Sequence, residues 1–190
     1  MDDDRPPSVI VTIDSPGWPA VLDDAPAACQ QAVAATLARA TPGLQPIRAE
    51  VSVLLGDDLA VRQLNADHRQ QDKPTNVLAF PLLELEHGRP RDRLPLQAFD
   101  GPVMLGDIAV ALGTVCREAS DAKRPVRAHL SHLVVHGTLH LLGFDHGDDQ
   151  EAEVMEDLER HILADLGIPD PYAEPADDRA GVGQCAQEAV

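Results

Sequence analysis

Residues 136–149 read HGTLHLLGFDHGDD, and three histidines of this stretch surround the end of a predicted helix. His136 and His140 are four residues apart, so a helix places them one turn apart on the same face, where two imidazoles can bind one zinc ion. Gly143 is a typical helix stop, and the turn after it brings His146 back toward the other two. Three protein ligands leave the fourth position of zinc open for water, which is the catalytic pattern. We therefore expect one zinc ion per chain, bound by His136, His140 and His146.

The predicted helix that carries this motif is rich in histidine. Residues 126–142 are almost entirely apolar apart from His129, His132, His136 and His140. At about 100° per residue, these four fall in one narrow stripe. A core histidine bonded to a backbone carbonyl is the ordinary explanation for any single one, but burying four imidazoles is costly unless each has a partner. A metal ion supplies partners for several at once, and we expect His132 to line the pocket and His129 to be structural.

Asp145 lies directly before the third histidine of the motif. Three roles are open to it: a hydrogen bond to a ligand histidine, acceptance of a proton, or capping of the loop. The first is favoured, because ligand histidines commonly donate their second N–H to a carboxylate.

The spacing HxxxHxxGxxH equals that of the metzincin metalloproteases, with one informative departure. Those enzymes carry Glu directly after the first His as the general base. This chain has Gly137 at that position. Peptide hydrolysis by the usual route therefore lacks its base.

Outside the motif, β-branched runs and amphipathic segments are separated by turn signals. Strands are predicted at residues 9–13, 49–55, 75–80 and 104–110. Helices are predicted at residues 22–40, after a cap at Asp57 or Asp58, from the fourth strand to about residue 123, at 126–142 and at 149–166, with a long loop at 84–102. Because strands come early and helices late, the fold class is α+β, with a mixed sheet of about four strands packed with about five helices.

The composition is that of one globular domain with added termini. The chain has 190 residues, 44% of them apolar and 25% charged, and its three cysteines lie outside any CxxC pattern. It has no apolar run of about eighteen residues and no basic leader, so we expect neither a membrane span nor a signal peptide, and a cytoplasmic location. We expect a single domain over residues 1–172 and a disordered acidic tail at residues 173–190.

The formal net charge of −17 would normally argue against a nucleic-acid partner, because phosphate affinity comes from lysines and arginines. The acids, however, are concentrated near the termini, since residues 145–190 hold 14 acids against two bases. The middle of the chain is nearly neutral and leaves room for a basic patch, with Arg62, Arg69 and Lys73 as candidates.

Four motifs follow one another along the chain: KPTNVLAFP at 73–81, LGDI at 105–108, HGTLHLLGFDHGDD at 136–149 and LGIPDPY at 166–172. In them the sequence resembles the bacterial YbeY-type rRNA maturation factor family of single-strand-specific zinc endoribonucleases. The resemblance implies a zincin-like α+β fold, zinc ligands at His136, His140 and His146, and a functional arginine at Arg69, six residues before Thr75. It also implies processing of the small-subunit rRNA 3′ end and a role in ribosome quality control. One small departure is Ala79, where the family often has Ser.

A phosphodiester substrate suits this set of residues. Zinc lowers the pKa of bound water to roughly 7, so a nucleophile is available without a strong protein base, and the RNA 2′-hydroxyl is the other candidate nucleophile. The charge that develops on the phosphate needs a cation, and a guanidinium binds two phosphate oxygens at once. Arg69 is our candidate for this role. The alternative interpretation of Arg69 is a surface ion pair with Asp67 or Asp72.

We expect single-stranded RNA and ribosomal RNA as substrates, the ribosome or ribosome-associated proteins as partners, and neither DNA nor a membrane. Two other classes are the alternatives: another zinc hydrolase, such as a metallopeptidase, and a non-catalytic ribosome-associated protein whose zinc only holds the fold. Gly137 argues against the first alternative, and the open fourth coordination position argues against the second.

Overall fold

The computed structural model describes residues 7–41, 49–90 and 101–173. Apart from Ala173, the expected acidic tail lies outside the described residues. The elements, in chain order, are β1 (Ser8–Ile13), α1 (Trp18–Val21), α2 (Ala25–Ala40), β2 (Ala49–Gly56), α3 (Asp58–Arg69), β3 (Val77–Pro81), β4 (Leu85–Glu86), β5 (Arg89–Pro90), β6 (Val103–Ala111), α4 (Leu112–Asp121), α5 (Val126–Leu141) and α6 (Asp149–Asp165). None of the described helices has the length and apolar character that crossing a membrane requires.

The main sheet has four strands in the order β1-β2-β6-β3. β1, β2 and β6 run parallel, and β3 pairs antiparallel with β6 at one edge. This arrangement confirms the predicted α+β class and the mixed four-stranded sheet. Six helices are described where about five were predicted, and the additional one is the four-residue α1.

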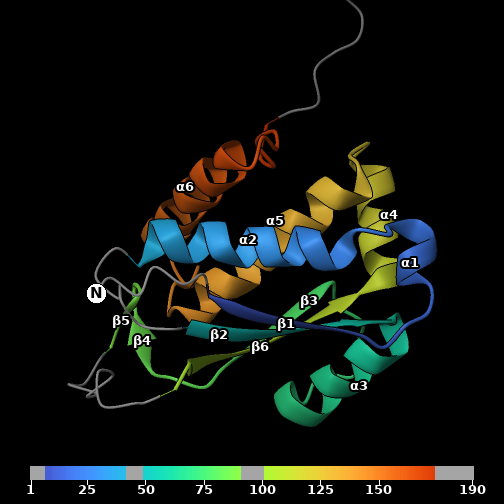
Figure 1. The fold of residues 1–190 in the computed structure, drawn as a ribbon, viewed down its shortest axis with the longest axis horizontal. Coiled ribbons are helices and arrows are strands. Elements are labelled where there is room, and N and C mark those ends of the chain that lie inside the picture. Colours follow the sequence, from blue (N-terminus) through green and yellow to red (C-terminus); the bar gives the residue numbers. More distant parts are fainter. Residues whose placement is uncertain (1–6, 42–48, 91–100, 174–190) are drawn as a thin grey trace, which may run out of the picture.

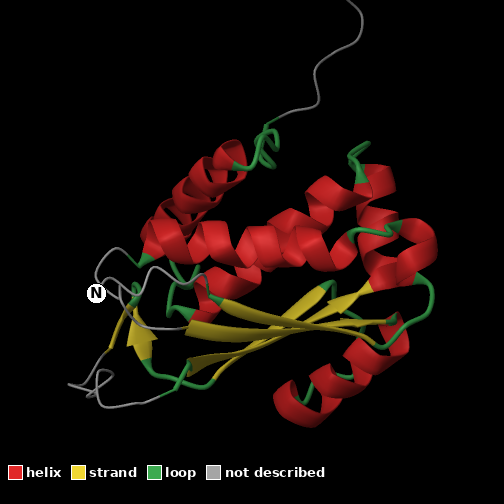
Figure 2. Ribbon diagram, viewed as in Figure 1, coloured by secondary structure: helices red, strands yellow, loops and turns green. Residues whose placement is uncertain are grey.

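Helices cover the sheet unequally. α2, α5 and α6 lie on one side of it, and α3 lies against the other side (Figures 1 and 2). The main hydrophobic core forms between the sheet and the helices of the first side, and joins Val53 and Ile108 to Val33 of α2 and Val134 of α5. The core therefore holds α5 as the central helix between the sheet and α6.

α5 is buried on nearly every side, and histidines mark its open side. Pro125 precedes its first turn, where a missing N–H costs no hydrogen bond. Between Leu130 and Leu141, the positions that are not buried are His132, His136 and His140. The apolar residues of α5 thus fix the helix in the core, and the packing leaves a histidine stripe facing outward.

Three short elements, α1, β4 and β5, lie in segments that the sequence did not assign to helix or strand. α1 begins with Trp18, which is fully buried and whose Nε1 donates to the Gly56 carbonyl at 3.0 Å. β4 and β5 form a two-stranded hairpin inside the predicted long loop. The amide of Gly88 in this hairpin donates to the Leu142 carbonyl at 2.8 Å, so the hairpin packs against the end of α5.

Candidate metal centre

Three histidines meet at the C-terminal end of α5. His136 and His140 lie on its last two turns, and their Nε2 atoms are 3.1 Å apart. His146 follows in the next loop, with its ring centroid 5.6 Å from that of His136 and 5.1 Å from that of His140. One nitrogen from each ring lies within 4.8 Å of the others. The structure thus brings together the three residues that the sequence predicted as zinc ligands.

A tight reversal at Gly143 returns the chain toward α5. Gly143 has φ +77°, a left-handed conformation that favours glycine, and a Cβ there would lie 1.9 Å from the Leu85 carbonyl oxygen. The Phe144 amide donates to the Leu139 carbonyl at 3.1 Å and closes the turn. The hairpin strand β4 therefore leaves room for glycine alone at the turn that positions His146.

Asp145 caps this loop. Its Oδ1 accepts a hydrogen bond from the His146 amide at 2.9 Å. The same oxygen lies 4.0 Å from His140 Nδ1, which is too long for a hydrogen bond. Of the three roles considered for Asp145, the structure shows the capping role and does not show the favoured bond to a ligand histidine.

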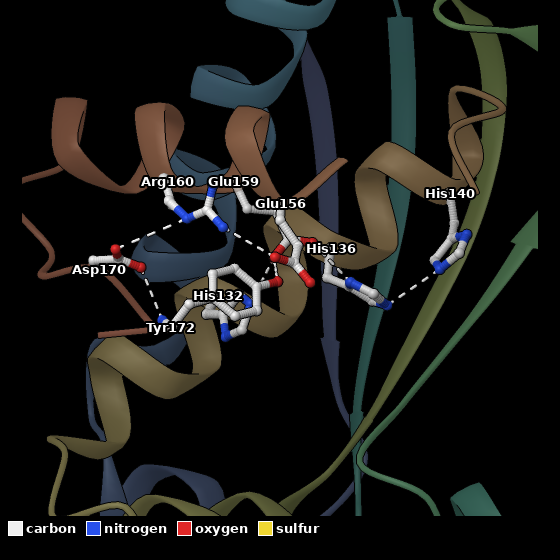
Figure 3. A network of polar contacts seen from close by, with 8 residues as sticks. All are labelled: His132, His136, His140, Glu156, Glu159, Arg160, Asp170 and Tyr172. Carbon is white, nitrogen blue, oxygen red and sulfur yellow. Dashed lines mark hydrogen bonds and ion pairs between the residues drawn. The ribbon is translucent and has the colours of Figure 1, made fainter. Parts of the chain in front are cut away.

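The carboxylate that contacts His136 is Glu159, from α6. Its side chain is fully buried, with Oε1 2.8 Å from His136 Nδ1 and Oε2 2.8 Å from His132 Nε2 (Figure 3). The Tyr172 hydroxyl also donates to Oε2. Burial alone would raise the pKa of Glu159, but the bonds from His132 and His136 bring it down to about 2, so the carboxylate is ionised.

Glu159 is not among the site residues predicted from the sequence. The available signal was a glutamate on the apolar side of the last helix, four residues after Met155 and three before Ile162, both of which are buried. A buried carboxylate at such a position needs hydrogen-bond donors from another element.

The hydrogen bond of His136 and the burial of His140 suit a zinc ion. A carboxylate only accepts hydrogen bonds, so His136 Nδ1 carries the proton donated to Glu159, and the lone pair of the neutral ring lies on Nε2. Burial, followed by the neighbouring His136 and His146, lowers the pKa of His140 to about 4, so this ring is neutral at pH 7. Imidazole nitrogens gathered this closely are typical zinc donors, and these residues therefore fit the expected ion.

The other two histidines of the stripe bond carboxylates. His129 Nε2 lies 2.7 Å from Oε2 of Glu118, and Glu118 also accepts from the Asn76 side-chain amide at 3.0 Å. His132 bonds Glu159, as described above. Both rings therefore have carboxylate partners in place of the backbone carbonyls considered from the sequence, and the structural role of His129 stays a prediction.

Arg69 is the last residue of α3 and is exposed. Its Nη2 donates to the Ala79 carbonyl of β3 at 3.1 Å. The two acids considered as ion-pair partners of Arg69 have other partners: Asp72 pairs with Arg62, and Asp67 accepts from Gln63. Arg69 thus reaches from α3 to the edge strand β3, against which α5 also packs.

Asp107, in the LGDI motif, does not lie at the group of His136, His140 and His146. It lines a groove of about 520 Å³ on the side of the sheet that α3 covers, together with His68 and Phe80. The rings of His68 and Phe80 meet there edge to face, with centroids 5.1 Å apart. α5, which carries His136 and His140, lies on the opposite side of the sheet (Figure 1).

A protein-family model described as Endoribonuclease YbeY matches residues 22–167 of the chain. The chain belongs to the YbeY family. It is 49% identical over 175 residues to Endoribonuclease YbeY of Rhodopseudomonas palustris strain BisA53, covering 92% of this chain and 94% of the relative. It is 51% identical over 151 residues to the YbeY protein of Bradyrhizobium diazoefficiens, covering 80% and 78% of the two chains.

Among solved structures, the chain is similar to the solution structure of a Thermotoga maritima protein. The sequence identity is 20% and the TM-score is 0.46, with 89% of this chain and 99% of that chain covered.

Proposed function

We propose that this chain is a zinc-dependent endoribonuclease that cuts single-stranded RNA. The observation that carries the proposal is the group of His136, His140 and His146, with ligand atoms within 4.8 Å of one another, in a chain of the YbeY family. The relatives carry the name endoribonuclease, which supports RNA as the substrate class.

Each residue of the site has a distinct task in this proposal. His136, His140 and His146 bind the zinc ion, which when bound activates water and polarises a phosphoryl oxygen. Arg69 binds the substrate phosphate and offsets the negative charge that develops on it, because a guanidinium can contact two oxygens at once. Arg69 donates one Nη2 hydrogen bond to Ala79 and is exposed, so its other N–H groups remain available to a phosphate.

The charge of the chain supports recruitment through the ribosome. A formal net charge of −17 gives weak affinity for free RNA, because few phosphates can be neutralised. We infer that a ribosome or a ribosome-associated protein brings the substrate, that the substrate is ribosomal RNA, and that the protein acts in the cytoplasm. Maturation of the small-subunit rRNA 3′ end and ribosome quality control are the processes proposed for it.

Side-by-side digestion tests the proposed function. Wild-type protein loaded with zinc is incubated with single-stranded RNA, duplex RNA, single-stranded DNA of the same sequence and a denatured protein. We expect cleavage of the single-stranded RNA alone, because unpaired bases can enter a cleft and the 2′-hydroxyl distinguishes RNA from DNA. A chelator should abolish this cleavage, and added zinc should restore it.

The matched variants are His136→Ala and His161→Ala. His161 is exposed on α6, where its Nδ1 contacts the Asp157 carbonyl of the same helix. His161→Ala should cut RNA as wild type does, and His136→Ala should not. RNA cleavage that survives in His136→Ala would refute the proposal, as would proteolysis that His136→Ala abolishes.

A further inference from the structure

Glu159 connects two histidines of α5 with the segment that follows α6. Its side chain is fully buried, and both of its oxygens accept hydrogen bonds. Oε1 accepts from His136, and Oε2 accepts from His132 and from Tyr172. A buried carboxylate is costly unless donors surround it, and removing one donor leaves the rest of such a network under-satisfied.

Tyr172 is held in place by contacts of its own. Its ring lies edge to face with His132, with centroids 5.8 Å apart, and the guanidinium carbon of Arg160 lies 5.1 Å from the Tyr172 ring centroid. The Tyr172 amide donates to Asp170 Oδ1 at 2.8 Å, and Asp170 Oδ2 lies 3.9 Å from Arg160 Nε. Residues 170–172 therefore fold back toward α6, so that the tyrosine hydroxyl reaches the buried carboxylate (Figure 3).

The orientation of His136 depends on this carboxylate. A neutral imidazole has two tautomers, and only the tautomer with its proton on Nδ1 leaves a lone pair on Nε2. Glu159 accepts from Nδ1 and so selects that tautomer, with Nε2 directed to His140 Nε2 at 3.1 Å. Acceptors of this kind also fix the plane of the ring.

We propose that Glu159 and Tyr172 are positioning residues of the metal centre. Glu159 holds the His136 ring with Nε2 toward His140 and His146, and Tyr172 holds the Glu159 carboxylate. The inference rests on the proposed zinc site and extends it, because it makes zinc affinity depend on two residues that do not contact the ion.

The test compares Glu159→Gln and Tyr172→Phe with a control, Glu153→Gln, in the full chain. Glutamine keeps the shape of Glu159 but replaces one carboxylate oxygen by an amide group that donates. The groups around it, on His132, His136 and Tyr172, are also donors. Phenylalanine keeps the ring of Tyr172 and removes the hydroxyl. Glu153 is exposed on the same helix, so its substitution changes charge without touching the histidines.

Zinc dissociation constants are measured by competition with a chromogenic chelator. We expect Glu159→Gln to bind zinc about 10- to 100-fold more weakly than wild type, which is typical when a partner of a ligand histidine is lost. Tyr172→Phe should weaken binding by about 3-fold or more, because one of several bonds to the carboxylate is removed. Glu153→Gln should bind zinc as wild type does.

The absorption spectrum of Co²⁺ bound in place of zinc separates positioning from general stability. Reorienting a ligand imidazole changes the ligand field, so the spectrum should shift in Glu159→Gln and Tyr172→Phe and stay unchanged in Glu153→Gln. A Tyr172→Phe variant with the zinc affinity or the Co²⁺ spectrum of the control would overturn the inference, and this variant decides the matter if Glu159→Gln does not fold.

The same experiment distinguishes this inference from the proposed function. One outcome is that the wild-type protein binds zinc, both variants bind it more weakly, and the wild-type protein cuts no RNA. This outcome would contradict the proposed activity and leave the positioning roles intact. Wild-type protein that binds no zinc would contradict both.

Discussion

Gly137 packs directly against Ile108 of the sheet: a Cβ at position 137 would lie 3.2 Å from Ile108 Cγ2 and 3.3 Å from Cδ1. This position follows the first ligand histidine, where metzincins carry their glutamate base. In this chain it faces the hydrophobic core, so no carboxylate from position 137 reaches the histidine group. The packing gives a physical reason why peptide hydrolysis by that route is unavailable here.

We predict that Gly137→Glu destabilises the fold by about 3 kcal/mol or more, because it buries an unpaired charge against Ile108. Gly137→Ala is the control: alanine gains about 1 kcal/mol of helix propensity, which offsets a tight methyl contact, and the net change should be small. Urea unfolding measures both variants. A Gly137→Glu protein as stable as wild type would contradict the packing described here.

His140→Ala should lose most of the bound zinc, because no other described histidine is placed to replace it at the group of three. Metal analysis after desalting checks this, with wild type expected at about one zinc per chain. His161→Ala is the control and should retain its zinc. Unchanged zinc content in His140→Ala would show that the assignment of ligands is wrong.

Arg69→Ala should keep zinc and lose RNA cleavage. The substitution removes one part-buried hydrogen bond to Ala79, so the cost in stability should be no more than about 1 kcal/mol. Arg69→Lys should restore cleavage poorly, because an ammonium lacks the bidentate fork of a guanidinium.

Arg39→Ala is the control for Arg69, since Arg39 is an exposed arginine paired with Asp165 on another part of the surface. It should cut RNA normally. Full cleavage by Arg69→Ala would remove Arg69 from the substrate-binding residues.

The hydrogen bonds of Asp58 predict that the free energy of unfolding depends on pH. Its Oδ1 accepts from the Thr114 amide and its Oδ2 from Arg117, joining α3 to α4. Although burial acts to raise the pKa of Asp58, these bonds bring it below its ordinary value of 3.8. A carboxylate whose pKa is lowered by folding stabilises the protein above its unfolded pKa, and this contribution is lost as pH falls through the folded pKa.

We therefore expect Asp58→Asn to reduce the free energy of unfolding by about 1 kcal/mol at pH 7. The difference from wild type should shrink as pH falls below about 4, where the wild-type carboxylate becomes protonated. Urea unfolding at a series of pH values measures it. A difference that grows on acidification would contradict the assigned contacts of Asp58.

The four strands of the main sheet and the longer helices were predictable because their signals are local. The short β-branched runs and Ala- or Leu-rich segments follow the period of the element that each forms. The meeting of His136, His140 and His146 was also predictable, because helix periodicity and one glycine turn are sufficient to bring them together.

Features that depend on contacts between distant segments were not predictable. Glu159 meets His136 only because α6 packs on α5, and nothing in the residues around Glu159 indicates which donors it will find. Trp18 lies in a segment that the sequence assigned to neither helix nor strand, yet it is fully buried and its Nε1 donates to the Gly56 carbonyl, 38 residues away. The β4–β5 hairpin was missed because two-residue strands are too short to show periodicity.

The contact between Glu159 and His136 can form only late in the synthesis of the chain. A ribosome extends the chain from the N-terminus, so His136, His140 and His146 emerge before α6 and well before Tyr172. Until residues 159–172 have emerged, the His136 ring lacks the carboxylate that it contacts in the folded chain, and that carboxylate lacks its tyrosine donor. A nascent chain therefore carries all three candidate ligands before it carries the groups that orient His136, and the site reaches its final geometry only when the domain is nearly complete.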